Sequence, residues 1–331
     1  MKEAIVTCDG INVTSEIIES PIPVPGQGEI LIKVVVSGTN PKDWKYPYYT
    51  KTPMDSGDDI AGYVESFGQG VIGFSKGDRV AAFHKMGYKA GSFAEYALAF
   101  DYSTFHIPAH TSFEEASTIP LAALTAAYGL FDTLKLPTPW QPAKTSIPLL
   151  VWGASTSVGA FAVKLAKLAG IGPIIGVAGQ GSEFAKSIGV DFVVDYRAPD
   201  VVHQIRKCLS PGQKLEYAWD TISEKGSYQY CISAMEPGSS HLSLILPERR
   251  FDDIGDGIDY SITAVANAHK DNAGLRDFGY FFYKLVSKWL VENRLSGHPY
   301  ETVSGLEGVG PALKNVLEGK NSAFKYVIRV D

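Results

Sequence analysis

The sequence predicts an α/β protein whose later half forms a doubly wound parallel sheet and whose first half forms a partly open β-barrel or sandwich. A strand, a turn of small residues and an amphipathic helix follow one another between residues 147 and 170. Short apolar runs then alternate with helical patterns to about residue 265, which is typical of a parallel sheet. Before residue 150, glycines and prolines separate closely spaced strand-like runs.

Length and composition restrict the class of protein. A chain of 331 residues predicts two domains, and 45% hydrophobic with 20% charged residues is typical of a globular protein. The net charge of −6, with scattered basic residues, argues against nucleic-acid binding. No run reaches the ~18 apolar residues of a membrane span and residues 1–10 do not resemble a signal peptide, so we expect a cytoplasmic protein. The widely spaced Cys8, Cys208 and Cys231 predict free thiols.

The stretch from 147 to 170 organises the rest of the chain. Residues 147–152 read as a strand, and residues 153–159 form a turn of small residues. Apolar residues then recur at the spacing of one helical face: Val158, Ala162, Leu165, Ala166 and Ala169. Such a turn lets a pyrophosphate approach the backbone, next to the free N–H groups of a helix N-terminus. This order is that of the first unit of a dinucleotide-binding fold.

The glycine fingerprint of that unit is incomplete. When G-x-G-x-x-G is aligned on Gly159, its first two glycine positions fall on Ala154 and Thr156, with an extra Gly153 just before. A small-residue turn also occurs in α/β proteins that bind no nucleotide. The turn alone therefore leaves both interpretations open.

The first half contains short strands. They are expected at residues 3–7, 13–19, 29–37, 63–67 and 78–83, with another short strand after 91–97. Residues 38–45 read as an irregular loop because they contain Gly38 and Pro41, and residues 111–117 read as a turn.

The second half alternates helices and strands. Helices are expected at residues 119–134, 158–169, 183–188, 278–290 and 308–319, and strands at 173–178, 192–197, 217–220, 241–246 and 325–330.

Several motifs in a fixed order carry a family resemblance that covers essentially the whole chain. They are NPKDWK, GDDIAGYVESFG, FSKGDRVAAF, GSFAEYA, IPLAALTAAYGL and GASTSVG. Their order resembles the medium-chain dehydrogenase/reductase superfamily, and within it the zinc-free quinone and enoyl reductases, especially the fungal ToxD-like and trans-acting polyketide enoyl reductases. The resemblance implies a Rossmann domain at about 121–269 and a discontinuous GroES-like catalytic domain formed by 1–120 and about 270–331.

The resemblance also implies that zinc is absent. Zinc alcohol dehydrogenases of this superfamily carry a cysteine and a Gly-His-Glu where this chain has Asn40 and Gly57-Asp58-Asp59. Asparagine supplies no thiolate and the histidine is missing, whereas a catalytic zinc site needs three protein ligands. We expect Asp58 and Asp59 to be structural residues of a turn, and no metal in the protein.

The expected cofactor is NADPH. The strand at 173–178 ends without the acidic residue that holds the ribose hydroxyls of NAD and would repel a 2′-phosphate. The resemblance places Tyr196 at that phosphate with Arg197 nearby, although Tyr196 can also be read as an aromatic residue that packs on the sheet. If the turn at 153–159 binds the pyrophosphate, serine and threonine hydroxyls supplement its backbone donors, and Thr156→Val is expected to weaken NADPH binding. The full set of expected cofactor contacts is Asn40, Pro41, Asp43, Gly153, Ala154, Ser155, Thr156, Ser157, Val158, Gly159, Ala178, Gly179, Gln180, Gly181, Ser182, Tyr196, Arg197, Leu244 and Val327.

The resemblance implies reduction of an activated C=C bond by hydride transfer. Lys45 and Thr125 match its catalytic lysine and threonine, and each also has a structural interpretation, as a loop lysine and as a buried threonine bonded to its own helix. Either one could serve as a donor to the developing enolate oxygen, and a proton must then reach the α-carbon. Substrate contacts are expected at Tyr46, Tyr48 and Tyr128, with Lys42 and Tyr49 as further candidates for the acid. The seven histidines show no metal or triad spacing and are expected to be structural.

Three functions remain open at this stage. The first is an NADPH-dependent enoyl reductase that acts on a small-molecule or carrier-bound enoyl substrate, with a synthase as a candidate partner. The second is a quinone or alkenal reductase. The third is a nucleotide-binding partner or structural protein without catalysis. The sequence is compatible with a monomer or a homodimer.

Overall fold

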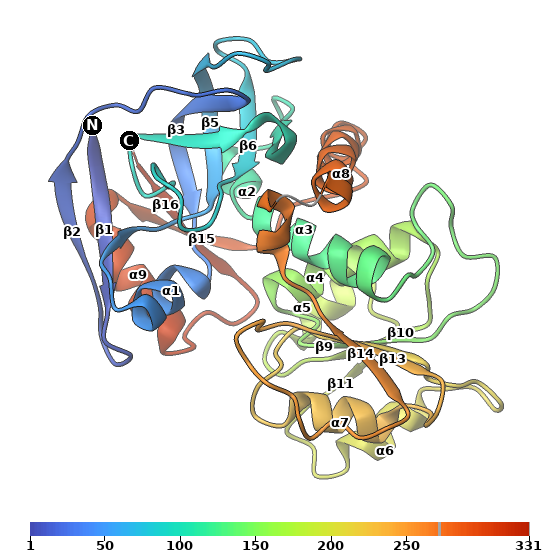
Figure 1. The fold of residues 1–331 in the computed structure, drawn as a ribbon. Helices are drawn as coiled ribbons and strands as arrows, with labels where there is room; N and C mark the ends of the chain where they lie inside the picture. The colour runs from blue at the N-terminus through green and yellow to red at the C-terminus, as the bar shows by residue number, and fades with distance from the viewer. Residues whose placement is uncertain (271–272, 331) are drawn as a thin grey trace. The chain divides into compact units, whose positions relative to one another are not determined.

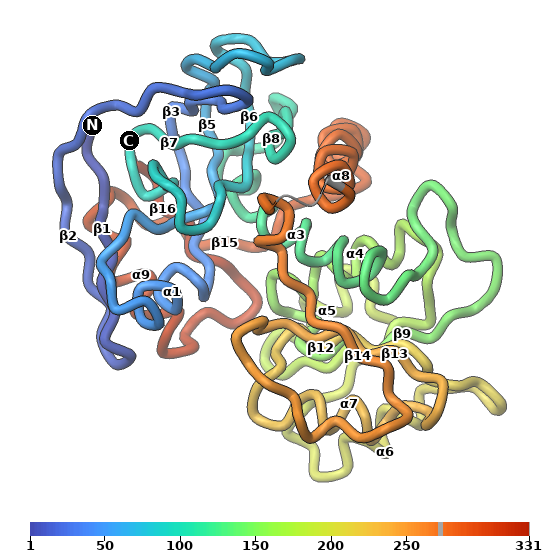
Figure 2. Tube along the Cα trace, in the orientation of Figure 1, coloured from blue at the N-terminus to red at the C-terminus, as the bar shows by residue number. Residues whose placement is uncertain are grey.

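The computed structural model describes residues 1–270 and 273–330. The chain forms two compact units, and the chain path from one to the other and back can be followed in Figure 2. Unit 1 contains Met1–Leu121 and Ala266–Asp331, and unit 2 contains Ala122–Val265.

Unit 1 is built on a mainly antiparallel sheet with the order β15-β16-β3-β5-β6-β8, in which β7 also pairs with β3 (Figure 1). The pairing of β3 with β5 contains register shifts between Leu31 and Ile32 and between Val34 and Val36, which bend the sheet. The last strand of the chain, β16, lies antiparallel to β3, so a C-terminal segment completes a sheet built mainly from the first 106 residues. The strands are β3 (Glu29–Gly38), β5 (Asp59–Phe67), β6 (Arg79–Phe83), β7 (Tyr96–Phe100), β8 (Thr104–His106), β15 (Tyr300–Ser304) and β16 (Lys325–Arg329).

A second, smaller sheet completes unit 1. It has the order β2-β1-β4 and comprises β1 (Lys2–Cys8), β2 (Val13–Glu19) and β4 (Met54–Asp55). Apolar residues of β1 pack with residues of helix α9 in one core cluster, among them Ala4, Val6, Val309 and Leu313. The helices of unit 1 are α1 (Lys42–Thr50), α2 (Phe113–Ala116), α8 (Ala273–Val291) and α9 (Val309–Leu317).

Unit 2 is a parallel sheet flanked by helices. Within the described residues its strand order is β11-β10-β9-β12-β13-β14, and every pairing is parallel. Helices α6 and α7 pack on one face through Ile205 and Cys231, whereas α4 lies on the other face in Figure 1. The strands are β9 (Leu149–Trp152), β10 (Ile174–Val177), β11 (Phe192–Val194), β12 (Tyr217–Asp220), β13 (Ser240–Leu244) and β14 (Ile258–Ile262). The helices are α4 (Ser157–Leu168), α5 (Ser182–Ser187), α6 (Val201–Lys207) and α7 (Ser227–Ala234).

The α/β fold class predicted from the sequence is confirmed. Strands β9 to β13 and helices α4 and α5 lie where hydrophobic periodicity placed them, within one or two residues at most ends. Strands β4, β8, β14 and β15 were not predicted, because each is short or largely exposed and shows little apolar alternation.

The prediction of an irregular loop at residues 38–45 was wrong. Helix α1 begins at Lys42, because Pro41 with φ −55° already has helical backbone and the Asp43 carboxylate accepts a hydrogen bond from the Asn40 N–H at 2.7 Å. Pro47 lies inside the helix, where it cannot donate to the carbonyl of Asp43. That carbonyl instead accepts a hydrogen bond from the Ser56 hydroxyl at 3.2 Å.

Three further predictions need correction. The turn at 111–117 contains the short helix α2, which begins after Ser112 because the Ser112 hydroxyl accepts a hydrogen bond from the Glu115 N–H. The helix predicted at 119–134 is α-helical only from Pro120 to Ala127 (α3) and continues as π-helix over Tyr128–Thr133. Asp59 is the first residue of strand β5 and not part of a turn.

Cys8, Cys208 and Cys231 are free thiols, as predicted. In the part of the chain that the structure describes, no helix is long and apolar enough to cross a membrane.

Candidate active site

The turn after β9 joins the central strand of unit 2 to helix α4. Thr156 is the N-cap of α4, and its hydroxyl oxygen accepts a hydrogen bond from the Gly159 N–H at 3.1 Å. The N–H groups of Ser157 and Val158, in the first turn of α4, have no acceptor among the described residues. These two donors lie at the positive end of the helix dipole, an arrangement that favours an anion.

The hydroxyl of Thr156 already donates one hydrogen bond and accepts another within the protein. Thr221 donates its hydroxyl proton to the carbonyl of Trp152 at 2.8 Å, so it is an acceptor in its 3.2 Å contact with the Thr156 hydroxyl. Thr156 therefore donates to Thr221 and accepts from Gly159. The sequence-based expectation that this hydroxyl donates to a pyrophosphate is replaced by a capping role, and Ser155 and Ser157 remain as hydroxyl donors.

Two glycines explain why this turn needs small residues. Gly153 has φ +80°, a conformation that side chains disfavour. A Cβ added at Gly159 would lie 2.1 Å from the carbonyl oxygen of Gly153. The last glycine of the fingerprint is thus required by packing between the helix and the strand, as the sequence pattern predicted.

The strand order reverses at β9, which lies between β10 and β12. At such a point the connections leave toward opposite faces, and ligands of open α/β sheets bind at the carboxyl ends of the strands there. The predicted cofactor residues at 153–159 and 178–182 both follow carboxyl ends of these central strands.

The ends of β10 and β11 lie side by side. A Cβ at Gly179 would lie 2.6 Å from the ring of Tyr196, so the glycine allows the tyrosine to pack over the turn, and that ring is 52% exposed. Ser182 bonds back to the carbonyl of Gly179 at 2.6 Å. The Arg197 side chain bonds the carboxylate of Asp195 at 2.9 and 3.1 Å, and these hydrogen bonds lower the pKa of Asp195 to about 2.

Four of the predicted cofactor residues have no exposed surface: Asp43, Ala154, Leu244 and Val327. Leu244 and Val327 lie inside β13 and β16, and Ala154 donates its N–H to the carbonyl of Val177. Direct contact of their side chains with a ligand is therefore not supported by this structure, and we assign them packing or positioning roles. Asn40 is nearly buried and Pro41 is exposed.

Helix α1 carries the predicted catalytic lysine and two predicted substrate residues. Lys45 is half-buried, with its ammonium 5.6 Å from the centre of the Trp44 ring. Tyr46 is 40% exposed, and its ring lies against Gly87. Tyr48 packs against Tyr49, with ring centres 5.3 Å apart.

Helix α3 and the π-helical segment after it carry Thr125 and Tyr128. Thr125 is 6% exposed and Tyr128 is 2% exposed. The π-helical turn coincides with a close approach at Gly129, where a Cβ would lie 2.4 Å from the Trp219 ring. Insertions of this kind often accompany functional sites because they redirect side chains.

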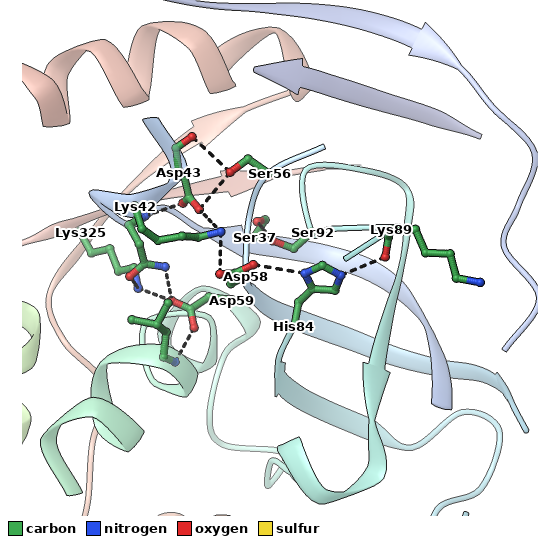
Figure 3. Close-up of polar contacts among 12 residues, drawn as sticks. Ser37, Lys42, Asp43, Ser56, Asp58, Asp59, His84, Lys89, Ser92 and Lys325 are labelled. Carbon is green, nitrogen blue, oxygen red and sulfur yellow. Dashed lines mark hydrogen bonds and ion pairs between the residues drawn. The ribbon is translucent and has the colours of Figure 1, made fainter. Parts of the chain in front are cut away.

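Two groups of buried charges surround the start of α1 (Figure 3). In the first, Asp59 accepts hydrogen bonds from Asn40 Nδ2 at 2.8 Å and from the backbone N–H of Leu121 at 2.7 Å, and it pairs with the ammonium of Lys325. Lys325 also donates to Asn40 Oδ1 at 3.1 Å. The first group, which we call the Asp59 group, joins β5, β16 and the start of α3.

The second group, which we call the Asp58 group, is a chain of alternating charges. Lys42 lies 3.1 Å from Asp43 and 2.6 Å from Asp58, and Asp58 lies 3.2 Å from His84. Burial alone would lower the pKa of Lys42, but the two carboxylates outweigh it and raise that pKa above its usual value. Burial raises the pKa of Asp43 to about 6, against the opposing effect of Lys42. Lys42, a further candidate acid from the sequence, is therefore a poor proton donor.

The Asp58 group also bears on metal binding. In residues 1–270 and 273–330, no three His, Cys, Asp or Glu side chains are placed to hold a metal ion. The Lys42 ammonium already lies between Asp43 and Asp58, where a cation would otherwise be attracted. The side-chain oxygen of Asn40 already accepts a hydrogen bond from Lys325. The donor set at this location does not fit zinc.

Sequence reasoning missed His84, Lys325 and Thr221. Their partners Asp58, Asp59 and Trp152 lie 26, 266 and 69 residues away in the sequence, so no local sequence pattern predicts these contacts. The acidic pair Asp58-Asp59 was noticed, but its two carboxylates enter different groups.

Two family models match the chain. The alcohol dehydrogenase GroES-like domain matches residues 26–109, in unit 1, and the zinc-binding dehydrogenase model matches residues 157–245, in unit 2. The region matched by the second model includes neither Asn40 nor Asp58.

The chain is also similar to curated proteins over nearly its whole length. It is 42% identical over 314 residues to the trans-enoyl reductase fsr4 of Gibberella fujikuroi, which covers 92% of this chain and 91% of the relative. It is 33% identical over 344 residues to the trans-enoyl reductase resD of Aspergillus sclerotiorum, covering 94% and 96%.

Solved structures agree on the fold. An alcohol dehydrogenase superfamily protein from Novosphingobium aromaticivorans superimposes with a TM-score of 0.84 at 22% identity and 100% coverage of both chains. The CurK enoyl reductase gives 0.78 at 19% identity and 99% coverage of both. The family models and the sequence relatives confirm the predicted family: this chain belongs to the trans-enoyl reductase branch of the medium-chain dehydrogenase/reductase superfamily.

Proposed function

We propose that this protein reduces the activated C=C bond of an enoyl or enone substrate with NADPH and without zinc, and that the substrate is a polyketide or other secondary-metabolite intermediate held as a thioester. The observation that carries the proposal is the capped turn at the strand-order reversal of unit 2. There the free N–H groups of Ser157 and Val158 lie at the start of α4. The relatives named as trans-enoyl reductases supply the reaction class.

The residues present at this turn fit a dinucleotide. The small residues at 153–159 leave the backbone accessible, and Ser155 and Ser157 add hydroxyls beside the N–H groups. The turn after β10 contains Gly179-Gln180-Gly181 and carries no acid, which favours a 2′-phosphate. Tyr196 offers an exposed ring beside this turn. Arg197 is a cation there, although Asp195 neutralises much of its charge.

Lys45 and Thr125 are the proposed catalytic residues. When bound, the reduced nicotinamide supplies a hydride to the β-carbon of the substrate. Lys45 and Thr125 would then donate hydrogen bonds to the substrate carbonyl oxygen, where negative charge develops. Tyr46 and Tyr48, beside Lys45 on α1, are proposed to contact the substrate, and Tyr128 to shape the site from the π-helical turn.

We also propose that the reaction uses no zinc. The support for this proposal is the donor set around Asn40 and Asp58, in which the ammonium of Lys42 pairs with Asp58 and that of Lys325 donates to the side-chain oxygen of Asn40. Charge stabilisation at the substrate oxygen then depends on side-chain donors and not on a Lewis acid.

The remaining proposals concern organisation and partners. We propose that unit 1 is the catalytic domain and unit 2 the dinucleotide-binding domain, close to the boundaries expected from the sequence. We further propose that the protein works in the cytoplasm, as a monomer or homodimer, and in trans with a synthase that presents the substrate.

The test is NADPH oxidation by the purified protein with a panel of enoyl thioesters, enals and quinones. The proposal predicts turnover with an enoyl thioester, preference for NADPH over NADH, and no loss of rate after treatment with a strong zinc chelator. Lys45→Met and Thr125→Val are expected to lower kcat by roughly 10²-fold or more, since each removes a donor at the oxyanion.

The other outcomes identify the competing functions. Turnover of quinones or free enals, but of no thioester, would support the quinone or alkenal reductase. Tight NADPH binding without turnover of any acceptor would support the non-catalytic nucleotide-binding protein. Stoichiometric zinc with chelator-sensitive activity would contradict the metal-free chemistry.

A further inference from the structure

His84 lies at the end of the Asp58 group and is 1% exposed (Figure 3). It follows strand β6 directly, and its backbone N–H donates to the carbonyl of Asp58 at 2.8 Å. Its ring has two polar contacts: Nδ1 lies 3.2 Å from Asp58 Oδ1, and Nε2 lies 3.0 Å from the carbonyl oxygen of Lys89. Both ring nitrogens therefore face oxygen atoms in the interior of unit 1.

These two contacts restrict the protons on the ring. A backbone carbonyl only accepts hydrogen bonds, so Nε2 must carry a proton toward Lys89. An ionised carboxylate also only accepts, so Nδ1 must carry a proton toward Asp58. A neutral imidazole has one N–H and can satisfy only one of the two. Either His84 has both protons, or Asp58 is protonated.

The surroundings decide in favour of an ionised Asp58. Burial raises the pKa of Asp58, but the Lys42 ammonium at 2.6 Å is the leading opposing effect, and that pKa lies below its usual value. The charges along the group then alternate from Asp43 through Lys42 and Asp58 to His84. Alternation places each buried charge next to one of opposite sign, which offsets part of the free-energy cost of burying it.

Other charged groups near His84 do not reverse this result. Asp55, at the end of β4, is a second carboxyl group close enough for His84 to lower its pKa, and it interacts in turn with Glu3. His269 is also close enough to interact with His84, but burial together with nearby positive charges lowers the pKa of His269 to about 3, so His269 adds no positive charge. Of the two carboxyl groups near the ring, Asp58 supplies the negative charge, because burial raises the pKa of Asp55 to about 7.

The position of His84 allows it to hold two segments of unit 1 together. Lys89 is in the loop that follows β6, and in that loop Gly87 contacts the ring of Tyr46 on α1. Lys42 is in the first turn of α1, three residues before Lys45. The connection from Lys89 through His84, Asp58 and Lys42 therefore joins the loop to the helix that carries the proposed catalytic lysine.

We propose that His84 is an imidazolium with both ring nitrogens protonated, and that it is a positioning residue that fixes the loop at 85–89 against the start of α1. Its protonation follows from the contacts alone, whereas its part in catalysis rests on the proposed function. The sequence predicted only that His84 is a structural residue, and this proposal says which structural role it has.

Nitrogen-15 NMR of histidine-labelled protein at about neutral pH tests the protonation directly, with His84→Gln used only to assign the resonance. We expect two protonated ring nitrogens for His84. Asp58→Asn offers an amide donor to Nδ1, so in that variant the ring is expected to become neutral. A single protonated nitrogen at His84 in the native protein would overturn the proposal, whatever the enzyme activity turns out to be.

Kinetics tests the positioning role. His84→Gln keeps a donor for the Lys89 carbonyl but loses the contact with Asp58, and we expect kcat/KM for the enoyl thioester to fall about tenfold while the Kd for NADPH changes by less than about twofold. The matched control is His106→Gln, because His106 also pairs with an aspartate, Asp78, at 3.0 Å, but at a half-exposed site in the same unit. We expect that control to change both quantities by less than about twofold. Unchanged kcat/KM in His84→Gln, or an equal loss of NADPH binding, would overturn the positioning role.

Discussion

The two regions that follow central strands in this protein are built in opposite ways. The turn at 153–159 in unit 2 uses small residues and backbone donors, and its one side-chain cap is local, from Thr156 to Gly159. The segment at 40–59 in unit 1 uses buried lysines and carboxylates whose partners are distant in sequence. The first region is tolerant wherever the backbone path is kept, whereas the second depends on every member of a charge group. Substitutions in the two regions should therefore differ in how much they lower the free energy of unfolding.

The largest expected effect is in the Asp59 group. Lys325→Met keeps the length of the side chain but leaves the carboxylate of Asp59 buried without its ammonium, and we expect a loss of about 3–5 kcal/mol in the free energy of unfolding. Chemical denaturation followed by circular dichroism measures it. The matched control is Lys167→Met, which breaks the 2.8 Å pair with Asp191, where both side chains are more than a third exposed, and should cost about 1 kcal/mol or less. Equal losses in the two variants would show that burial of the Asp59 group does not matter.

The next effect tests the turn in unit 2. Gly159→Ala places a Cβ at 2.1 Å from the carbonyl oxygen of Gly153, so α4 must move away from β9, at a cost of about 1–3 kcal/mol and with weaker NADPH binding. Gly255→Ala is the control, because no atom lies within 4 Å of its added Cβ. A Gly159→Ala protein with native stability and NADPH affinity would mean that this close approach is not required.

A pH effect is expected from Asp55, beside the same region of unit 1. Burial raises the pKa of Asp55 to about 7, with the N–H of Gly91 opposing the shift. The folded state therefore binds a proton that the unfolded state releases above its usual value of 3.8. This contribution to stability is complete at low pH and is lost as the pH rises toward 7 and above. Asp55→Asn cannot lose the proton, so it should gain roughly 1–2 kcal/mol relative to the native protein between about pH 5 and pH 8.

Denaturation of both proteins at the two pH values checks this prediction. Parallel pH dependence in the native protein and in Asp55→Asn would assign the effect to another group.

The smallest effect concerns the cap of α4. Thr156→Val removes the acceptor for the Gly159 N–H and should cost about 1 kcal/mol, together with a modest weakening of NADPH binding because the first turn of α4 is less well fixed. Thr156→Ser keeps the hydroxyl and should retain both. Thermal unfolding and NADPH titration by fluorescence measure the two quantities. An unchanged affinity in Thr156→Val would show that the cap of α4 does not influence NADPH binding.

The difference between the regions also explains what the sequence could predict. The strand, turn and helix around Gly159 were found because each signal is local: apolar runs, small residues and a helical period within a stretch of about 24 residues. The family resemblance, carried by motifs in order, gave the remainder of the fold class. Helix α1 was missed because Gly38 and Pro41 suggested a loop, and only the structure shows that Pro41 starts the helix and that Ser56 satisfies the carbonyl freed by Pro47.

The charge groups could not be predicted for a different reason. Asp59 contacts a backbone N–H 62 residues later and an ammonium 266 residues later. Such pairs depend on how β16 returns to β3, which no pattern near residue 59 encodes. The same holds for His84, which the sequence presents only as one of seven unremarkable histidines.

The most direct test of the central claim follows the hydride. The purified protein is given an enoyl thioester and NADPH that carries deuterium at the transferable position of the nicotinamide, and the product is examined by mass spectrometry and NMR. The account predicts a saturated thioester with a single deuterium at the β-carbon and a solvent-derived hydrogen at the α-carbon. A saturated product without deuterium at the β-carbon, or no saturated product at all, would contradict it.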